Sequence, residues 1–149
     1  MQAVQTIQET EDEIVDEFSL FDNWEDKYEY IIDLGKKLPP LETEHKKEEN
    51  KVKGCQSTVW LTADYKDGRI YYKAESDAVI VKGLISMLIR VLSGQNTDVI
   101  VSAKLDFINK IGMMSHLAQT RSNGLLSMVK QMKHYALAYK IKDPVPSKN

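Results

Sequence analysis

The fold class of this chain is indicated by one segment, residues 55–75, which reads CQSTVWLTADYKDGRIYYKAE. From Cys55 onward, alternate positions form a more apolar side, and the positions between them form a more polar side. This alternation is typical of a strand that buries one face. Asp67-Gly68 is a strong hairpin-turn signal, and we therefore expect residues 69–75 to form the return strand.

Apolar residues at helical spacing occupy the segments on both sides of the hairpin. A helix capped by Ser76 or Asp77 is expected to run to about Ser93, and because it is apolar on most sides it should be buried. Gly35 is a C-terminal signal for an earlier helix, which the following pair of prolines prevents from continuing. The other expected helices cover residues 5–18, 24–34, 98–103, 109–114 and 123–140. This order predicts an α+β fold, in which a small antiparallel sheet packs against several helices.

The length and charge of the chain limit the number of its domains and the kinds of partner it can have. Its 149 residues are about the size of one domain, and we expect a single domain, 1–149, with a core over about 5–141 and a loose tail at 142–149. The formal net charge of -2 gives no basic field for nucleic acid. No apolar run reaches the roughly 20 residues of a membrane span, and a signal peptide is not evident, so a cytoplasmic protein without membrane binding is predicted. One cysteine excludes an internal disulfide, and a reducing compartment suits a free thiol.

Cys55 lies where a polar segment meets the expected strand. Residues 41–53 are almost entirely polar and predict an exposed, mobile loop. A lone cysteine is usually a small buried hydrophobe. Here Gly54 permits unusual backbone angles, and Lys51 and Lys53 could favour the thiolate, which is the reactive form of a thiol. On these residues alone, a structural and a reactive Cys55 are equally supported.

Four segments, taken in order, carry a resemblance to a known family. They are Trp24–Gly35, Val52–Trp60, Ser76–Leu84, and His116-Leu117 with Thr120–Leu125. In these segments the chain resembles the SufE family of sulfur acceptors for cysteine desulfurases, over about residues 18–139. The resemblance implies a fold of the SufE/IscU type.

The resemblance also implies a function. A pyridoxal-phosphate cysteine desulfurase of the SufS type would hold sulfur from free cysteine as a persulfide, and Cys55 would attack the outer sulfur. The acceptor would pass this sulfur to a SufBCD-like scaffold for iron–sulfur clusters, and its removal would free the desulfurase for the next turnover. The chain would thus be a sulfur-transfer protein and an activator rather than an enzyme, with no cofactor or metal of its own. Because shielding a persulfide conflicts with presenting it, we expect residues 41–57 to move on docking.

The resemblance extends to residues around the cysteine. These are Gly54, Gln56, Ser57, Asp77, Arg121 and His116. For the two residues after Cys55, hydrogen bonds near a persulfide and ordinary strand-start roles both stay open. Asp77 either positions the loop or contacts the desulfurase, or it is an acid in the first turn of a helix. Arg121 either faces the partner, braces the loop or forms an ordinary ion pair, whereas His116 is interpreted as a hydrogen-bonded structural residue.

Three other functions compete with sulfur transfer. A thiol hydrolase would use Cys55 with His116 or His134 as base, but the sequence gives no oxyanion signature. A cluster scaffold or metal protein would need several ligands, and the single cysteine and scattered histidines show no metal-ligand spacing. An interaction domain without chemistry accounts for the core pattern but not for the combined segments. The chain departs from the family at two places. Thr58 stands where glutamine is common, and residues 41–53 are especially charged. These differences affect the expected choice of partner more than sulfur acceptance.

Overall fold

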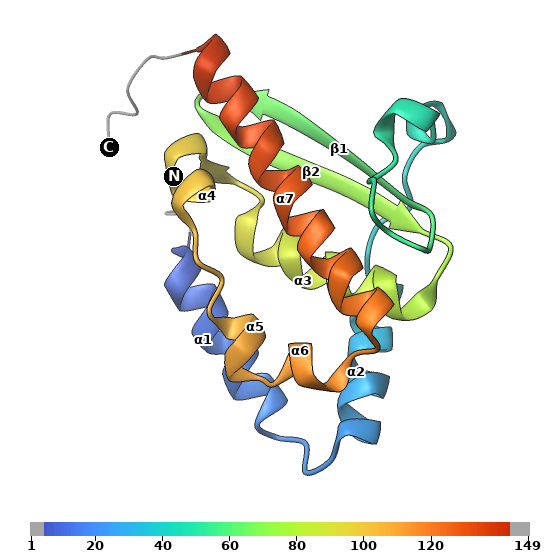
Figure 1. Ribbon diagram of the computed structural model, residues 1–149. Helices are drawn as coiled ribbons and strands as arrows, with labels where there is room; N and C mark the ends of the chain where they lie inside the picture. The colour runs from blue at the N-terminus through green and yellow to red at the C-terminus, as the bar shows by residue number, and fades with distance from the viewer. Residues whose placement is uncertain (1–4, 144–149) are drawn as a thin grey trace.

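Figure 1 shows the computed structural model, which describes residues 5–143. Helices cover one face of a small antiparallel sheet, which confirms the predicted α+β class. The elements are the helices α1 (Ile7–Phe18), α2 (Trp24–Lys36), α3 (Val79–Leu92), α4 (Thr97–Ser102), α5 (Phe107–Lys110), α6 (Met113–His116) and α7 (Gln119–Lys142), the strands β1 (Val59–Lys66), β2 (Arg69–Ser76) and β3 (Gln95–Asn96), and the short 3-10 turns η1 (Thr43–His45) and η2 (Glu48–Asn50). Among the described residues, no helix is long and apolar enough to cross a membrane.

The sheet is built on the hairpin that the sequence predicted. β1 and β2 pair antiparallel along their whole lengths, and β3 adds to the other edge of β2. Asp67 and Gly68 have positive φ angles of 52° and 80°, as in the tight turn whose twist matches two antiparallel strands. Tyr71 and Lys73 are exposed on the outer face of β2. The inner face is buried and consists mainly of Val59, Leu61, Ile70, Tyr72 and Ala74.

β1 begins four residues later than predicted, so Cys55 is not part of the strand. The Val52 N–H donates to the Val59 carbonyl at 2.8 Å, and Lys51 forms an isolated bridge with Trp60. Because these pairs close the backbone between Val52 and Val59 into a loop, this stretch cannot extend along the sheet. That loop carries Cys55.

Side chains of α7 bind the outer edge of β1. Tyr135 Oη donates to the Leu61 carbonyl at 3.1 Å, and Tyr139 Oη donates to the Ala63 carbonyl at 3.4 Å. Tyr72 Oη donates in the opposite direction, to a backbone carbonyl of α7, at 2.6 Å. These bonds fix α7 along the sheet, which it crosses in Figure 1.

α3 lies at the centre of the core and approaches α2 through two glycines. Gly83 in α3 lies against the backbone of Ile31, and an added Cβ would overlap the Ile31 carbonyl. A Cβ at Gly35 would lie 2.6 Å from Gly83 N. Gly35 is inside α2, so the prediction that it ends the helix is wrong. Its missing side chain instead permits the close contact with α3.

Other helix ends also differ from the prediction. Asn96 caps α4, which covers Thr97–Ser102, one residue earlier at each end than the predicted 98–103. α3 begins at Val79 without a side-chain cap, because the two expected caps bind the Cys55 loop instead. α7 begins at Gln119, four residues earlier than predicted, and two short helices, α5 and α6, replace the single turn expected before it. α7 continues to Lys142, where the loose tail was expected to begin, and residues 144–149 of that tail lie outside the described residues.

Residues 41–53 are mostly exposed, as predicted, but they are tied to the rest of the fold. The Leu41 N–H donates to Glu75 Oε1 at 2.7 Å, and Lys46 Nζ lies 2.8 Å from Glu75 Oε2. The side chains of Leu41 and Val52 are buried in spite of their polar neighbours. The segment is therefore anchored at both ends and near its middle, which the polar composition did not indicate.

The glycine contact leads to a prediction for two matched helix substitutions. Gly83→Ala should lower the free energy of unfolding by about 1–3 kcal/mol, because the added methyl group overpacks the α2–α3 contact. Gly124→Ala should leave it unchanged or raise it by up to about 1 kcal/mol, because its Cβ meets only Cys55, at 3.5 Å or more, and alanine favours helices. Urea unfolding followed by circular dichroism measures both. Equal losses in the two variants would contradict the packing explanation.

Candidate functional site

The Cys55 loop passes close over α7, and Gly54 allows this approach. Gly54 has a φ of +90°, which L side chains rarely adopt, and an added Cβ would lie 2.5 Å from Ser127 Oγ. The sequence singled out Gly54 for its backbone freedom. The structure adds a packing reason, because a side chain at that position would have to push the Ser127 side chain aside.

Residues just before α3 hold the other end of the loop. The Thr58 N–H donates to Asp77 Oδ1 at 3.2 Å, and Ser76 Oγ donates to the Thr58 carbonyl at 2.8 Å. Ser76 Oγ also accepts from the Ala78 N–H at 3.2 Å. Asp77 therefore lies against the loop, two residues before α3 begins, and not in the first turn of that helix.

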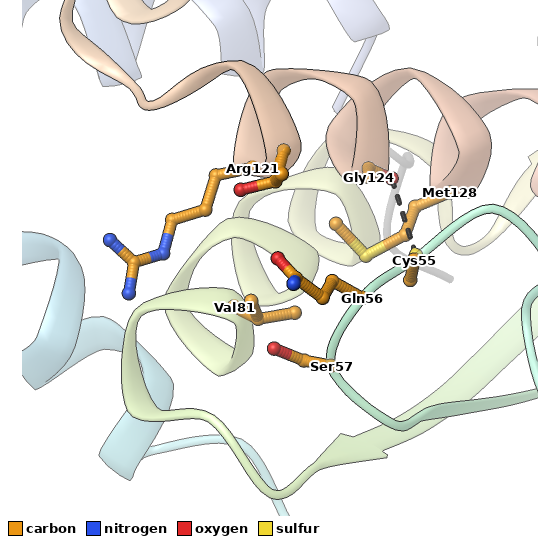
Figure 2. Close-up of a pocket in the computed structure, with 8 residues that line it drawn as sticks. Cys55, Gln56, Ser57, Val81, Arg121, Gly124 and Met128 are labelled. Atoms are coloured by element: carbon orange, nitrogen blue, oxygen red, sulfur yellow. Dashed lines mark hydrogen bonds between the residues drawn. The ribbon is translucent and has the colours of Figure 1, made fainter.

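A pocket of about 110 Å³ opens beside the Cys55 sulfur. Its residues come from the loop, the start of α3 and the first turns of α7, as Figure 2 shows. They are Cys55, Gln56, Ser57, Val81, Thr120, Arg121, Gly124 and Met128. A cavity needs only about 10–15 Å³ to hold one water molecule, so this pocket has room for an additional atom of the size of sulfur. Four of the residues predicted from the sequence thus meet at one place, although they come from segments far apart in the chain.

The backbone of α7 at Gly124 lies directly against the cysteine. Cys55 Sγ lies 3.6 Å from the Gly124 carbonyl oxygen, within reach of a weak S–H···O hydrogen bond, drawn as a dashed line in Figure 2. An added Cβ at Gly124 would lie 3.5 Å from Sγ. Four further residues that line the pocket were not among the predicted site residues: Val81, Thr120, Gly124 and Met128. A glycine inside a helical pattern often marks a close backbone approach, and this was the available signal.

The Cys55 thiol is stabilised in its protonated form. The side chain is half-buried, and burial raises the pKa of the Cys55 thiol because it disfavours the charged thiolate. Lys51, which was expected to favour the thiolate, lies 3.1 Å from Glu48 Oε1 instead. Lys53 is exposed. For the free protein, the prediction that these lysines activate the thiol is therefore wrong.

His116 lies outside the pocket. Its ring stacks on Trp24 with centroids 4.2 Å apart, and its Nδ1 lies 2.9 Å from the Gly112 carbonyl oxygen. Tyr28 Oη donates to the His116 carbonyl. These contacts are those of a structural, hydrogen-bonded histidine. Because no histidine occurs among the described residues that line the pocket, a hydrolase with His116 or His134 as base has no geometric support.

Arg121 is the one charged residue among the described residues that line the pocket, which offers no metal site. Arg121 is exposed, and in Figure 2 its guanidinium is directed away from Cys55. Within the described part of the chain Arg121 forms no ion pair, so its charge is available at the surface. The same part of the chain holds no group of three or more histidine, cysteine and acidic residues that could bind a metal ion.

The chain is similar to known proteins over most of its length. Residues 12–136 match the family described as SufE, Fe-S metabolism associated domain. An uncharacterized SufE-like protein of Rhizobium meliloti (strain 1021) is 42% identical over 130 residues, which cover 84% of this chain and 93% of that protein. An uncharacterized SufE-like protein of Synechocystis is 39% identical over 128 residues, which cover 86% of this chain and 80% of that protein.

A plant protein and a solved structure extend these comparisons. SufE-like protein 1, chloroplastic/mitochondrial, of Arabidopsis thaliana is 40% identical over 131 residues, which cover 87% of this chain but 35% of the plant protein. The solution structure of a hypothetical protein from Thermus thermophilus has a TM-score of 0.71 at 18% sequence identity, and the match covers 87% of this chain and 94% of that one. The likeness to the Thermus thermophilus structure shows a shared fold.

Burial of the thiol leads to a prediction for its alkylation. The rate of modification by iodoacetamide should rise with pH, with a midpoint above that of the same protein unfolded in urea, because the folded environment disfavours the thiolate. Mass spectrometry gives the rate at each pH. A Lys51→Gln, Lys53→Gln variant should keep the folded midpoint. If this variant raised the midpoint clearly, the lysines would favour the thiolate after all.

Proposed function

The chain belongs to the SufE family and so has a role in iron–sulfur metabolism, and on this premise we propose that Cys55 accepts sulfur from a cysteine desulfurase. The observation that carries the proposal is the pocket beside the Cys55 sulfur. The packing of Cys55 against its neighbours thus leaves one side of the sulfur open to the pocket. The space suits the outer sulfur of a persulfide.

The transfer is a thiolate displacement on sulfur. Cys55 Sγ, as the thiolate, attacks the outer sulfur of a persulfide held on a cysteine of the desulfurase. The new bond joins Cys55 Sγ to that outer sulfur, and the bond between the two desulfurase sulfurs breaks. The bonding electrons leave on the desulfurase cysteine, which as a thiolate can take up the proton released from Cys55. No oxidant or reductant is needed, because sulfur moves with its oxidation state unchanged.

The surroundings of the pocket favour an anion once sulfur is attached. Val81 lies in the first turn of α3, and Thr120 and Arg121 lie in the first turn of α7. Neither helix has a side-chain cap at its start, so unpaired N–H groups and the positive ends of two helix dipoles lie near the pocket. These helix N-termini would stabilise a persulfide anion relative to a neutral thiol.

The resting position of Cys55 requires a change on docking. Its thiol is half-buried, hydrogen-bonded to Gly124 and shifted toward the protonated form, so the free protein has a weak nucleophile. The loop is held by few bonds, chiefly those that Ser76 and Asp77 make to Thr58. We therefore propose that the partner displaces the loop and brings Cys55 to its own persulfide.

The remaining parts of the proposal concern partners. The desulfurase would be of the SufS type and would supply the pyridoxal phosphate, while this chain would activate it by removing the sulfur. A SufBCD-like scaffold for cluster assembly would receive the sulfur. We propose a cytoplasmic site of action, although the plant relative carries an organellar name.

Sulfur acceptance predicts a defined change in mass. After incubation with the desulfurase of the same source and free cysteine, the intact protein should gain one sulfur atom, because the Cys55 thiolate has displaced it from the partner. A reductant should remove this mass, and Cys55→Ser should never acquire it. If wild type gained no sulfur and desulfurase turnover stayed unchanged, the chain would instead be an interaction domain without chemistry.

Docking predicts faster amide exchange in the cysteine loop. Hydrogen exchange across residues 45–60 should rise in the complex with the desulfurase, because the bonds to Thr58 open when the loop is displaced. Mass-spectrometric exchange of free and bound protein measures this. The hairpin around Asp67, remote from the loop, serves as the internal reference. Equal exchange in both states would mean that Cys55 is reached without loop movement.

A further inference from the structure

The outward side of α7 carries a stripe that the pocket does not use. Leu126, Leu137 and Ile141 are 52%, 41% and 71% exposed, and Lys130 is exposed between them. Residues three, four or seven apart share one side of a helix, so these four lie along one side of α7, the α7 stripe, with Lys133 and His134 between Lys130 and Leu137. In Figure 1, α7 crosses the sheet with α4 beside it, and no helix of the described residues is drawn in front of it.

The α7 stripe lies on the opposite side of the helix from the cysteine pocket. Gly124 and Met128 face the pocket and are buried. Leu126 follows Gly124 by two residues, which turns it about 200° around the helix axis. Ser127, between the two sides, packs against Gly54. A protein bound to the stripe would therefore border the back of the Cys55 loop and leave the mouth of the pocket open.

The charge of α7 is of one sign. The helix, Gln119–Lys142, contains no acidic residue, although the net charge of the whole chain is -2. Lys140 lies 2.9 Å from Asp98, and Lys133 binds a backbone carbonyl, whereas Lys130 forms no ion pair in the described part of the chain. A basic helix with an aliphatic line is complementary to an acidic surface that has an apolar centre.

The width of the stripe favours a protein over a membrane. Helices that lie in membrane interfaces present a broad apolar face, commonly with aromatic residues, whereas this line is one aliphatic side chain wide. Such a narrow seam is typical of packing between helices. From Leu126 to Ile141 the line is about 22 Å long, which fits within one standard interface of about 800 Å² per partner.

We propose that the α7 stripe docks an acidic protein that receives sulfur from Cys55. The inference rests on the proposed function, because a sulfur carrier must meet a recipient as well as a donor. A recipient anchored behind the loop does not compete with the donor for the pocket mouth, and it meets the persulfide when the Cys55 loop is displaced from the pocket, the movement already proposed for docking of the donor. In the second transfer, a cysteine thiolate of the recipient bonds to the outer sulfur of the Cys55 persulfide. The sulfur–sulfur bond to Cys55 breaks, and Cys55 leaves as the thiolate.

The experiment compares two matched double variants. Lys130→Glu with Ile141→Gln alters the stripe, and Lys73→Glu with Leu20→Gln makes the same kinds of change on other surfaces, where Leu20 is 79% exposed. Each protein is loaded with radioactive sulfur by the desulfurase and then titrated against the iron–sulfur scaffold complex of the same source.

The stripe variant should load like wild type but need about tenfold more scaffold for half-maximal transfer. The control variant should match wild type in both steps, and added salt should weaken transfer from wild type more than from the stripe variant.

Other outcomes would overturn the inference. Equal transfer by both variants would remove the stripe from sulfur delivery, and a loss of loading confined to the stripe variant would assign the stripe to the donor. Binding of wild type, but not the stripe variant, to phosphatidylserine vesicles would make it a membrane surface. A wild-type dimer that the stripe substitutions dissociate would make it a self-interface. If wild type took no sulfur from the desulfurase, the proposed function itself would fail, and this inference with it.

Discussion

The backbone contact between α2 and α3 at Gly35 and Gly83 fixes the position of the residues around Cys55. Any side chain at Gly83 would overlap the Ile31 carbonyl, so α3 can lie only where two glycines let it approach. The segment that leads into α3 supplies Ser76 and Asp77, which hold the end of the cysteine loop. A helix-packing constraint deep in the core thus determines where a surface loop is held.

The proposed role of Cys55 as a sulfur carrier places two opposed demands on its site. A persulfide is protected by burial, but transfer needs it exposed to a partner. In the free protein, protection by burial outweighs exposure to a partner. The Cys55 thiol is half-buried and hydrogen-bonded to the Gly124 carbonyl, and burial raises its pKa. The loop itself is held by a few hydrogen bonds of about 1 kcal/mol each, which a docking protein can readily replace. Low reactivity in isolation and transfer in a complex are therefore compatible.

The sequence predicted local features well and contacts between distant segments poorly. The Asp67-Gly68 turn and the buried character of α3 follow from side-chain type and spacing, which act within a few residues. Gly35 was misread as a helix end because its reason lies in a helix almost fifty residues away. The strand start was placed at Cys55 because the bond between Val52 and Val59, which closes the loop, leaves no trace in the alternation. Cys55 itself was found mainly through its family resemblance, and its neighbour Gly124 only through the structure.

The tyrosines that α7 places along β1 have a consequence for self-assembly. The carbonyls of Val59, Leu61 and Ala63 are occupied by Val52, Tyr135 and Tyr139, so this edge of the sheet offers few free acceptors to a strand from another molecule. Exposed edges are the usual starting points of β-aggregation. Fibril growth through β1 would first require α7 to detach. The same helix that lines the Cys55 pocket thereby also protects the protein against aggregation.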